Sequence, residues 1–285
     1  MEEAPFILLP ILALLVSALT LVSGFGLGTL LLPAFAIFFP IPLAIGMTAL
    51  VHLATNVFKL IYIGKNADRS ILKSFGLPAI LAAIAGAALI SWIGHMAPLR
   101  KYEMSGQEHE VTLIKIIVGL IMVIFTLIEI VPKMTNTKFD RKMLPVGGIL
   151  SGFFGGLAGF QGALRSAFLL RLGLSRQAYA ATTIVIACMV DFSRLSVYVL
   201  DLFVRIKSQE TGGGVGQMTY LIKLLGGRSD DTRRMWVLIG LTSLAAFVGA
   251  FVGARMVRKI AIRTIQIIVG SALVLMGVAL IIGLV

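Results

Sequence analysis

The sequence predicts an all-α polytopic membrane protein made of two inverted repeats, each a glycine-broken helical hairpin followed by three transmembrane helices. About 8–10 membrane segments are expected in all. Hydrophobic residues make up 58% of the 285 residues and charged residues only 13%, whereas soluble chains carry about 25% charged residues. Apolar runs of roughly 20 residues recur along the chain, and two glycine-rich segments recur at matching positions in its two halves.

The first apolar run, residues 5–39, is too long for a single membrane span. As one helix it would measure ~50 Å, against a hydrocarbon core of ~30 Å. Three glycines, Gly24, Gly26 and Gly28, weaken the helix in its middle. We therefore expect an ascending helix at about 6–23 and a returning helix at about 28–39.

Three spans complete the first repeat, residues 1–135, and the second repeat, residues 136–285, has the same plan with an extra polar loop at 201–234. The segments expected after the first hairpin are, in chain order, about 43–64, 74–94 and 111–132, a broken pair at 144–159 and 162–173, and spans at 178–200, 235–255 and 263–284.

The two halves resemble each other at fixed spacings. Gly28 and Thr48 fall on Gly162 and Thr182 when the chain is shifted by 134 residues. Further along, IKIIVG at 114–119 matches IQIIVG at residues 265 to 270. The spacing changes only where the loops differ in length, which is the pattern expected of a duplicated transporter.

Basic residues cluster between the expected spans, which orients the chain. If each broken run enters the membrane and returns to the same side, the basic loops all lie on one side; they are 65–73, 133–142, 171–176 and 255–263. The acidic N-terminus and the loops at 94–110 and 201–234 lie on the other side. Because cytoplasmic loops are the basic ones, both termini are predicted to be outside a plasma or inner membrane, and the two repeats insert in opposite orientations.

Composition also limits the function classes. The net charge of +12 lies in these loops and not in a basic-aromatic surface, so no nucleic-acid partner is expected. The one cysteine, Cys188, excludes an intrachain disulfide or a CxxC metal site. Nucleotide-binding, metalloprotease and triad motifs are absent, so we expect no enzyme, cofactor or metal. Glu2 and Glu3 argue against a cleavable signal peptide. The sequence does not specify an oligomeric state.

The glycine segments are the candidate substrate site. A helix broken at membrane depth leaves N–H groups free, and these together with a positive helix end favour an anion. Close helix packing is the alternative reading, because small residues also bring membrane helices together. The candidate substrate-binding residues are Gly24, Phe25, Gly26, Gly28, Thr29, Thr48, Asn56, Gly159, Phe160, Gln161, Gly162, Arg165, Ser166 and Thr182.

Two of these candidates, Arg165 and Gln161, have long polar side chains near the expected tip of the second hairpin. Arg165 lies three residues after Gly162, where a buried arginine must be paired or functional. It either contacts an oxyanion or extends to the cytoplasmic surface. Gln161 is a polar amide at the expected tip, which suits substrate contact. The threonine hydroxyls at 48 and 182 either donate to the anion or bond to the preceding helical turn.

Three residues are candidates for coupling or gating. Asp191 and Arg194 are three residues apart in one span and are expected to pair on one helix face. This pair either lowers the cost of insertion or couples transport to protons, since Asp191 is the best intramembrane acid. His52, on one helical stripe with Asn56, either relays a proton or is hydrogen-bonded in a packing interface.

These segments resemble the TauE/SafE family of sulfite and organosulfonate exporters over essentially the whole chain. The resemblance rests on 24–33 followed by 44–48, and on 155–166 followed by 178–182, with a Gly-Ala-Arg end at Gly253. Phe160, Gln161 and Arg165 interrupt a segment that is richer in glycine in the family. The resemblance implies export of sulfite, an organosulfonate such as sulfoacetate, or thiosulfate by alternating access in a lipid bilayer. A channel with re-entrant filter loops is the alternative. Sequence decides neither the direction of transport nor the coupling ion.

Overall fold

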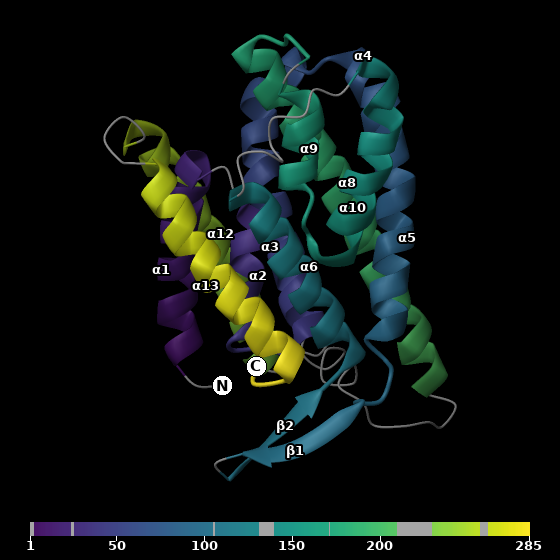
Figure 1. The fold of residues 1–285 in the computed structure, drawn as a ribbon, viewed down its shortest axis with the longest axis vertical. Coiled ribbons are helices and arrows are strands. Elements are labelled where there is room, and N and C mark those ends of the chain that lie inside the picture. Colours follow the sequence, from purple (N-terminus) through teal and green to yellow (C-terminus); the bar gives the residue numbers. More distant parts are fainter. Residues whose placement is uncertain are drawn as a thin grey trace.

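A computed structural model describes residues 3–23, 26–104, 106–130, 140–170, 172–209, 230–256 and 262–285 (Figure 1). In chain order its elements are α1 (Ala4–Ser23), α2 (Leu27–Ala36), α3 (Ile41–Ile63), η1 (Gly64–Asn66), α4 (Arg69–Ile71), η2 (Leu72–Gly76), α5 (Leu77–Ile93), β1 (Arg100–Met104), β2 (Gln107–Val111), α6 (Leu113–Ile130), η3 (Arg141–Met143), α8 (Leu144–Ala158), α9 (Gly162–Leu169), α10 (Arg176–Gln209), α12 (Asp230–Met256) and α13 (Ile262–Ile282).

Five helices in the described part of the chain are long and apolar enough to cross a membrane, and three more apolar helices are shorter. The predicted class, an all-α polytopic membrane protein, is therefore confirmed. The helices begin and end within a few residues of the expected bounds, except near the loops. Helix α10 continues past residue 201 to Gln209 and α12 begins at Asp230, so the loop expected at 201–234 is helical at both ends.

The loop expected at 94–110 contains an antiparallel β-hairpin instead. Strand β1 pairs with β2 in a register that sets Arg100 opposite Val111. The hairpin is held to the end of α13 by Tyr102, whose hydroxyl donates to the carbonyl of Ile282 at 2.6 Å. On its exposed face, a hydrogen bond from Lys101 to Glu110 raises the pKa of that lysine.

The first broken run forms the expected pair of helices, α1 and α2. Gly26 precedes α2 in an extended conformation (φ −68°, ψ 143°), so the chain turns here and does not continue one long helix. Figure 1 places both termini and the β-hairpin at one end of the molecule and α4 at the other. This fits the prediction that each broken run returns to the side from which it came. The membrane side of each end stays a prediction.

The second broken run is a tight hairpin of α8 and α9. Helix α8 ends at Gly159, whose φ of +86° lies in the left-handed region that favours glycine. The N–H of Gly159 bonds to the carbonyl of Gly155 at 2.9 Å, and the N–H of Phe160 bonds to the carbonyl of Phe154 at 3.3 Å. This left-handed cap ends α8 and lets α9 start at Gly162 and run back.

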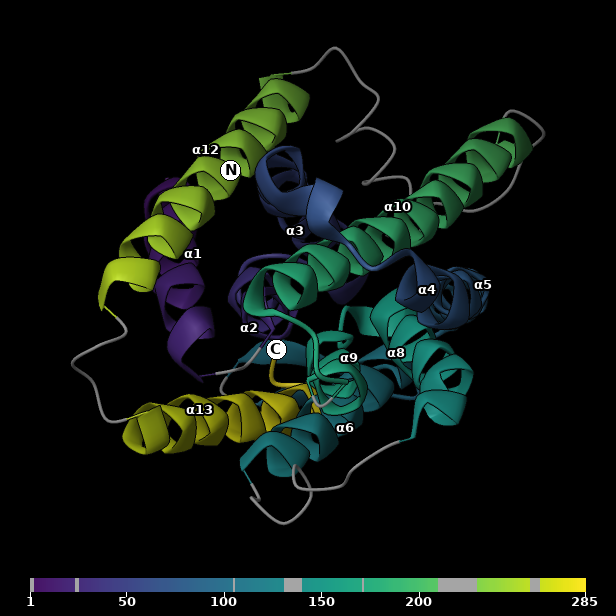
Figure 2. The ribbon, with the colours of Figure 1, turned by 90° about the horizontal axis from the view of Figure 1, so that it is seen from above.

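Helices pack across the two halves of the chain. Figure 2 shows α5 beside α8, α1 beside α12, α6 beside α13 and α3 beside α10, with α2 and α9 inside this ring. The α5–α8 contact is between backbones: a Cβ added at Gly152 or Gly156 would lie 2.1 Å from the carbonyl oxygen of Ala79 or Ala83. Such close approach is the usual basis of helix association in lipid.

The α1–α12 contact repeats this arrangement. A Cβ added at Gly249 would lie 2.1 Å from the carbonyl oxygen of Leu14, and one at Gly253 would lie 2.5 Å from that of Ala18. The first helix of each half thus packs on the fourth membrane segment of the other half. A two-fold relation between the halves requires this exchange, so it supports the inverted repeat, which remains an interpretation, as does the boundary after residue 135.

The backbone contacts predict that alanine substitutions at two glycines affect the stability of the protein differently. Gly152→Ala places a methyl group against the carbonyl of Ala79 and should lower the free energy of unfolding by about 1–3 kcal/mol. Gly46→Ala, on α3, meets nothing within 4 Å and should leave stability unchanged or raised. Thermal unfolding midpoints of the purified variants in detergent test this. Equal midpoints for the two variants would contradict backbone packing at α5–α8.

Candidate functional site

The two hairpin tips are in direct backbone contact. A Cβ added at Gly162 would lie 3.2 Å from the Cα of Gly26, and one at Gly28 would lie 3.1 Å from the carbonyl oxygen of Gly159. Phe160, at the second tip, is 1% exposed and packs on Phe125 of α6 with ring centroids 5.9 Å apart. The structure therefore brings together the glycine segments that the sequence singled out. Gly24 and Phe25 lie outside the described residues.

Both returning helices start at this meeting point without a side-chain cap. The residues before α2 and α9, Gly26 and Gln161, make no capping hydrogen bond through their side chains. The first N–H groups of a helix have no partner within it, and they carry the positive end of its dipole. Two positive ends thus lie next to each other at the contact between the tips. Thr29, in the first turn of α2, is buried beside them.

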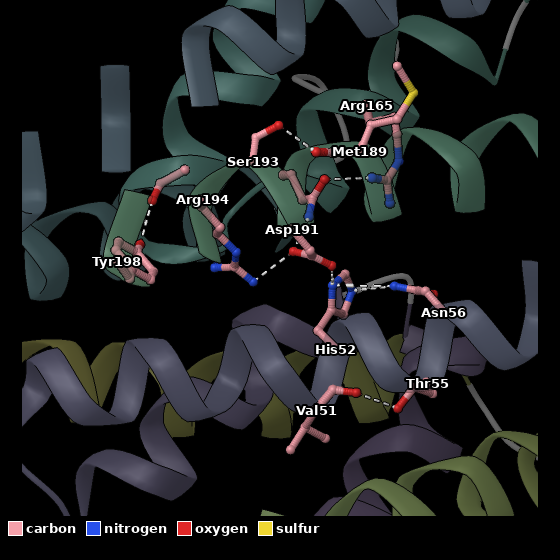
Figure 3. Close-up of polar contacts among 12 residues, drawn as sticks. Val51, His52, Thr55, Asn56, Arg165, Met189, Asp191, Ser193, Arg194 and Tyr198 are labelled. Atoms are coloured by element: carbon pink, nitrogen blue, oxygen red, sulfur yellow. Dashed lines mark hydrogen bonds and ion pairs between the residues drawn. The ribbon is translucent and has the colours of Figure 1, made fainter. Parts of the chain in front are cut away.

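A buried polar cluster lies beside the tips, with Asp191 at its centre (Figure 3). One carboxylate oxygen, Oδ2, lies 2.5 Å from Nδ1 of His52 on α3. The other, Oδ1, accepts from Nε2 of Gln161 at 3.1 Å and lies 2.8 Å from Nη2 of Arg194. The expected Asp191–Arg194 pair is confirmed, and one carboxylate links α3, α10 and the tip of the second hairpin.

Further polar side chains extend the cluster. Arg165 donates from Nη1 to Oε1 of Gln161 at 2.9 Å, so its guanidinium is turned toward the tip. The amide nitrogen of Asn56 lies 3.3 Å from the ring nitrogens of His52. Ser151 donates to the backbone carbonyl of Gln161 at 3.0 Å. Together these bonds hold the Gln161 side chain between Arg165 and Asp191.

Positive charge exceeds negative charge within this cluster. It contains two guanidinium groups, those of Arg165 and Arg194, and one carboxylate, that of Asp191. Arg194 is fully buried, and its Nε and Nη1 have no hydrogen-bond partner among the described residues. A buried positive charge that its surroundings do not neutralise is chemically suited to bind an anion.

Three further predicted site residues make no described contact with Asp191. Thr182 accepts a hydrogen bond from the backbone N–H of Asp68 at 2.9 Å, and Ser166 accepts one from the hydroxyl of Tyr179 at 3.3 Å. Thr48 is buried, and its hydroxyl has no partner within the described part of the chain. No contact described in the structure connects these three side chains to Asp191. Their role at the site stays a prediction.

Two residues that the sequence reasoning missed support the second hairpin. Tyr198 donates to the carbonyl of Gly156 at 2.7 Å, and Ser151 holds the carbonyl of Gln161. Tyr198 lies four residues after Arg194, on the same face of α10, and this spacing was the available signal. As for metals, no group of three or more His, Cys, Asp and Glu side chains that could bind one occurs among the described residues.

The ion pair between Asp191 and Arg194 predicts that substitutions at these two residues have non-additive effects on stability. Asp191→Asn leaves a buried guanidinium uncompensated and should lower the free energy of unfolding by about 3–5 kcal/mol. Adding Arg194→Gln should recover part of this loss, because the two side chains interact directly. Thermal unfolding of both single variants and the double variant measures the coupling, with Ser196→Ala on the exposed face of α10 as control. Strictly additive losses would contradict the pairing.

Comparison with known proteins gives one match. The family model described as the sulfite exporter TauE/SafE matches residues 9–280. No curated protein and no solved structure matches the chain. The match includes both hairpins and every helix of the polar cluster. The chain therefore belongs to the TauE/SafE family of sulfite exporters.

Proposed function

We propose that this chain is a secondary transporter that exports a small sulfur-containing anion across the plasma membrane by alternating access. Sulfite and organosulfonates such as sulfoacetate are the leading substrates, and thiosulfate is a further candidate. Membership of the sulfite exporter family supports an anion of this class. The observation that carries the proposal is the excess positive charge around Asp191, next to the two uncapped helix ends.

These features provide complementary interactions for an oxyanion. Guanidinium groups present planar sets of donors that match the oxygens of a sulfite or sulfonate group. Helix N-termini add N–H donors and a favourable dipole without a further charged side chain. The proposed substrate site comprises the tips with Gln161 and Arg165, and His52, Asp191 and Arg194 are the proposed coupling or gating groups.

The packing also indicates which parts would move together. Backbone contacts join α1 to α12 and α5 to α8, so we expect each pair to move as one body. The seam between the two bodies runs between α3 and α10 and between the two tips. The His52–Asp191 bond crosses this seam. Alternating access then requires the tips to separate and that bond to change.

Ligand-dependent stability tests the substrate class. Sulfite, sulfoacetate or thiosulfate at a hundredfold excess over its Kd should stabilise the purified protein by about 2.7 kcal/mol, whereas chloride should not. Arg165→Gln should weaken this stabilisation because it removes one guanidinium from the cluster. Arg69→Gln, on the exposed α4, is the matched control. The absence of stabilisation by any sulfur anion would count against the proposed substrate class.

A cross-link between the tips tests alternating access. In a Cys188→Ala background, Gly26→Cys and Gly162→Cys place two thiols at the backbone contact, close enough for a disulfide. Oxidation should stop sulfoacetate flux in reconstituted vesicles, and reduction should restore it. Each single-cysteine variant is the control, and a maleimide mass shift reports the free thiols. Undiminished flux through the oxidised double variant would refute tip separation, and flux that never saturates would favour a channel.

A further inference from the structure

Arg194 is a fully buried charged side chain. It is the largest fully buried side chain among the described residues. Its guanidinium lies against the second tip, where a Cβ built on Gly159 would be 3.0 Å from Nη1. Nε and Nη1 have no hydrogen-bond partner in the described part of the chain. Unpaired N–H donors on a buried charge cost free energy. The guanidinium of Arg194 can therefore still bind a hydrogen-bond acceptor.

Asp191 does not fill that capacity. Its Oδ1 is shared between Arg194 and Gln161, and its Oδ2 is occupied by His52. Asp191 therefore gives Arg194 one oxygen at one nitrogen, whereas a guanidinium can bind two oxygens of the same acceptor side by side. A sulfite or sulfonate group provides two such oxygens.

We infer that the transported oxyanion binds Arg194 directly and replaces Asp191 there, so that Asp191 is an internal anion that competes with the substrate. This inference rests on the proposed transport of a sulfur oxyanion. Arg194, a proposed coupling group, is then also a substrate ligand, and Arg165 holds the Gln161 amide that bonds Asp191. When Asp191 leaves Arg194, its carboxylate remains bonded to His52, and the His52–Asp191 pair can take up the proton that compensates for the lost cation.

Charge balance gives the number of protons. With neutral His52, the two guanidiniums and one carboxylate leave one positive charge, which a monoanion neutralises without a proton. A dianion neutralises the same cluster only if one proton binds the His52–Asp191 pair. One proton should therefore accompany each dianion, and none should accompany a monoanion. In the exchange Asp191 separates from Arg194 and stays bonded to His52. Substrate binding thereby changes the contacts at the seam between the two bodies.

Other ionisable groups in and around this cluster restrict the assignment. They are His52 and Lys59 on α3, Arg165 on α9, and Tyr179, Cys188, Arg194 and Tyr198 on α10. Helices α5 and α8 contribute none over their described lengths. Because His52 alone among these side chains bonds to Oδ2 of Asp191, it is the partner that we assign to the proton.

Calorimetric titration of the purified protein tests the inference with two permanent anions, thiosulfate as the dianion and methanesulfonate as the monoanion. Titration in two buffers of different ionisation enthalpy counts the protons bound. We expect about one proton per thiosulfate, an apparent Kd that rises about tenfold per pH unit across the titration of the pair, and no proton uptake with methanesulfonate.

Substitutions test the role of each residue in anion binding. Arg194→Gln should abolish binding of both anions, whereas Arg165→Gln should weaken binding without abolishing it. Asp191→Asn, which removes the internal competitor, should bind thiosulfate more tightly and without pH dependence, and thiosulfate should restore its thermal stability. A role of Asp191 in structure alone would not tighten binding. If Asp191→Asn does not fold, the proton count of the unmodified protein still decides the question.

The outcomes separate this inference from the proposed function. If neither sulfite, sulfoacetate, thiosulfate nor methanesulfonate binds the unmodified protein at any pH, the proposed function fails. If thiosulfate binds without proton uptake, or if Arg194→Gln binds it as the unmodified protein does, the proposed function stands and the exchange at Arg194 is refuted. Arg69→Gln, on the exposed α4, should match the unmodified protein in every titration.

Discussion

Close contact between helix backbones is the constraint on which the rest of this structure depends. Apolar side chains gain little by leaving lipid for a helix interface, so the helices must approach until their backbones pack. Gly152 on α8 and Gly249 on α12 permit this, each against a carbonyl of a helix from the other half. The partners in both contacts come from opposite halves of the chain, so the two halves interlock. The same exchange sets the two broken hairpins tip to tip.

The tips of the two broken hairpins place polar backbone groups inside an otherwise apolar protein. A broken helix leaves N–H groups unpaired, and these are tolerated at membrane depth only inside protein or beside a water-filled cavity. In this protein the broken ends meet within the ring of longer helices and next to Asp191. The glycines that allow the contact therefore also bring two helix ends beside a buried carboxylate and two guanidiniums.

Asp191 connects that environment to the packing. Its two carboxylate oxygens contact a residue from α3, a residue from the second tip and a residue one turn along α10. Any movement of α3 relative to α10 must change this set of bonds. The His52–Asp191 contact joins α3 to α10, so it is a suitable element for coupling the occupancy of the site to the arrangement of the helices.

The expectations that the structure confirmed depend on local sequence. The break near Gly26, the cap at Gly159 and the Asp191–Arg194 pair each involve residues a few positions apart, and backbone geometry determines such relations. The two misses also have local causes. The β-hairpin at 100–111 is rich in charge and lacks a continuous apolar alternation, and α10 extends beyond the apolar run because polar residues can continue a helix into water.

By itself, the sequence determined the class of protein, the approximate bounds of its spans and the two points at which helices break. It did not reveal the pairing of α5 with α8 and of α1 with α12, nor that His52 would meet Asp191, 139 residues away. Periodicity identifies the face of a helix that is buried but not the helix that covers it. Only the tertiary structure decided that, because the choice depends on how several backbones pack together at once.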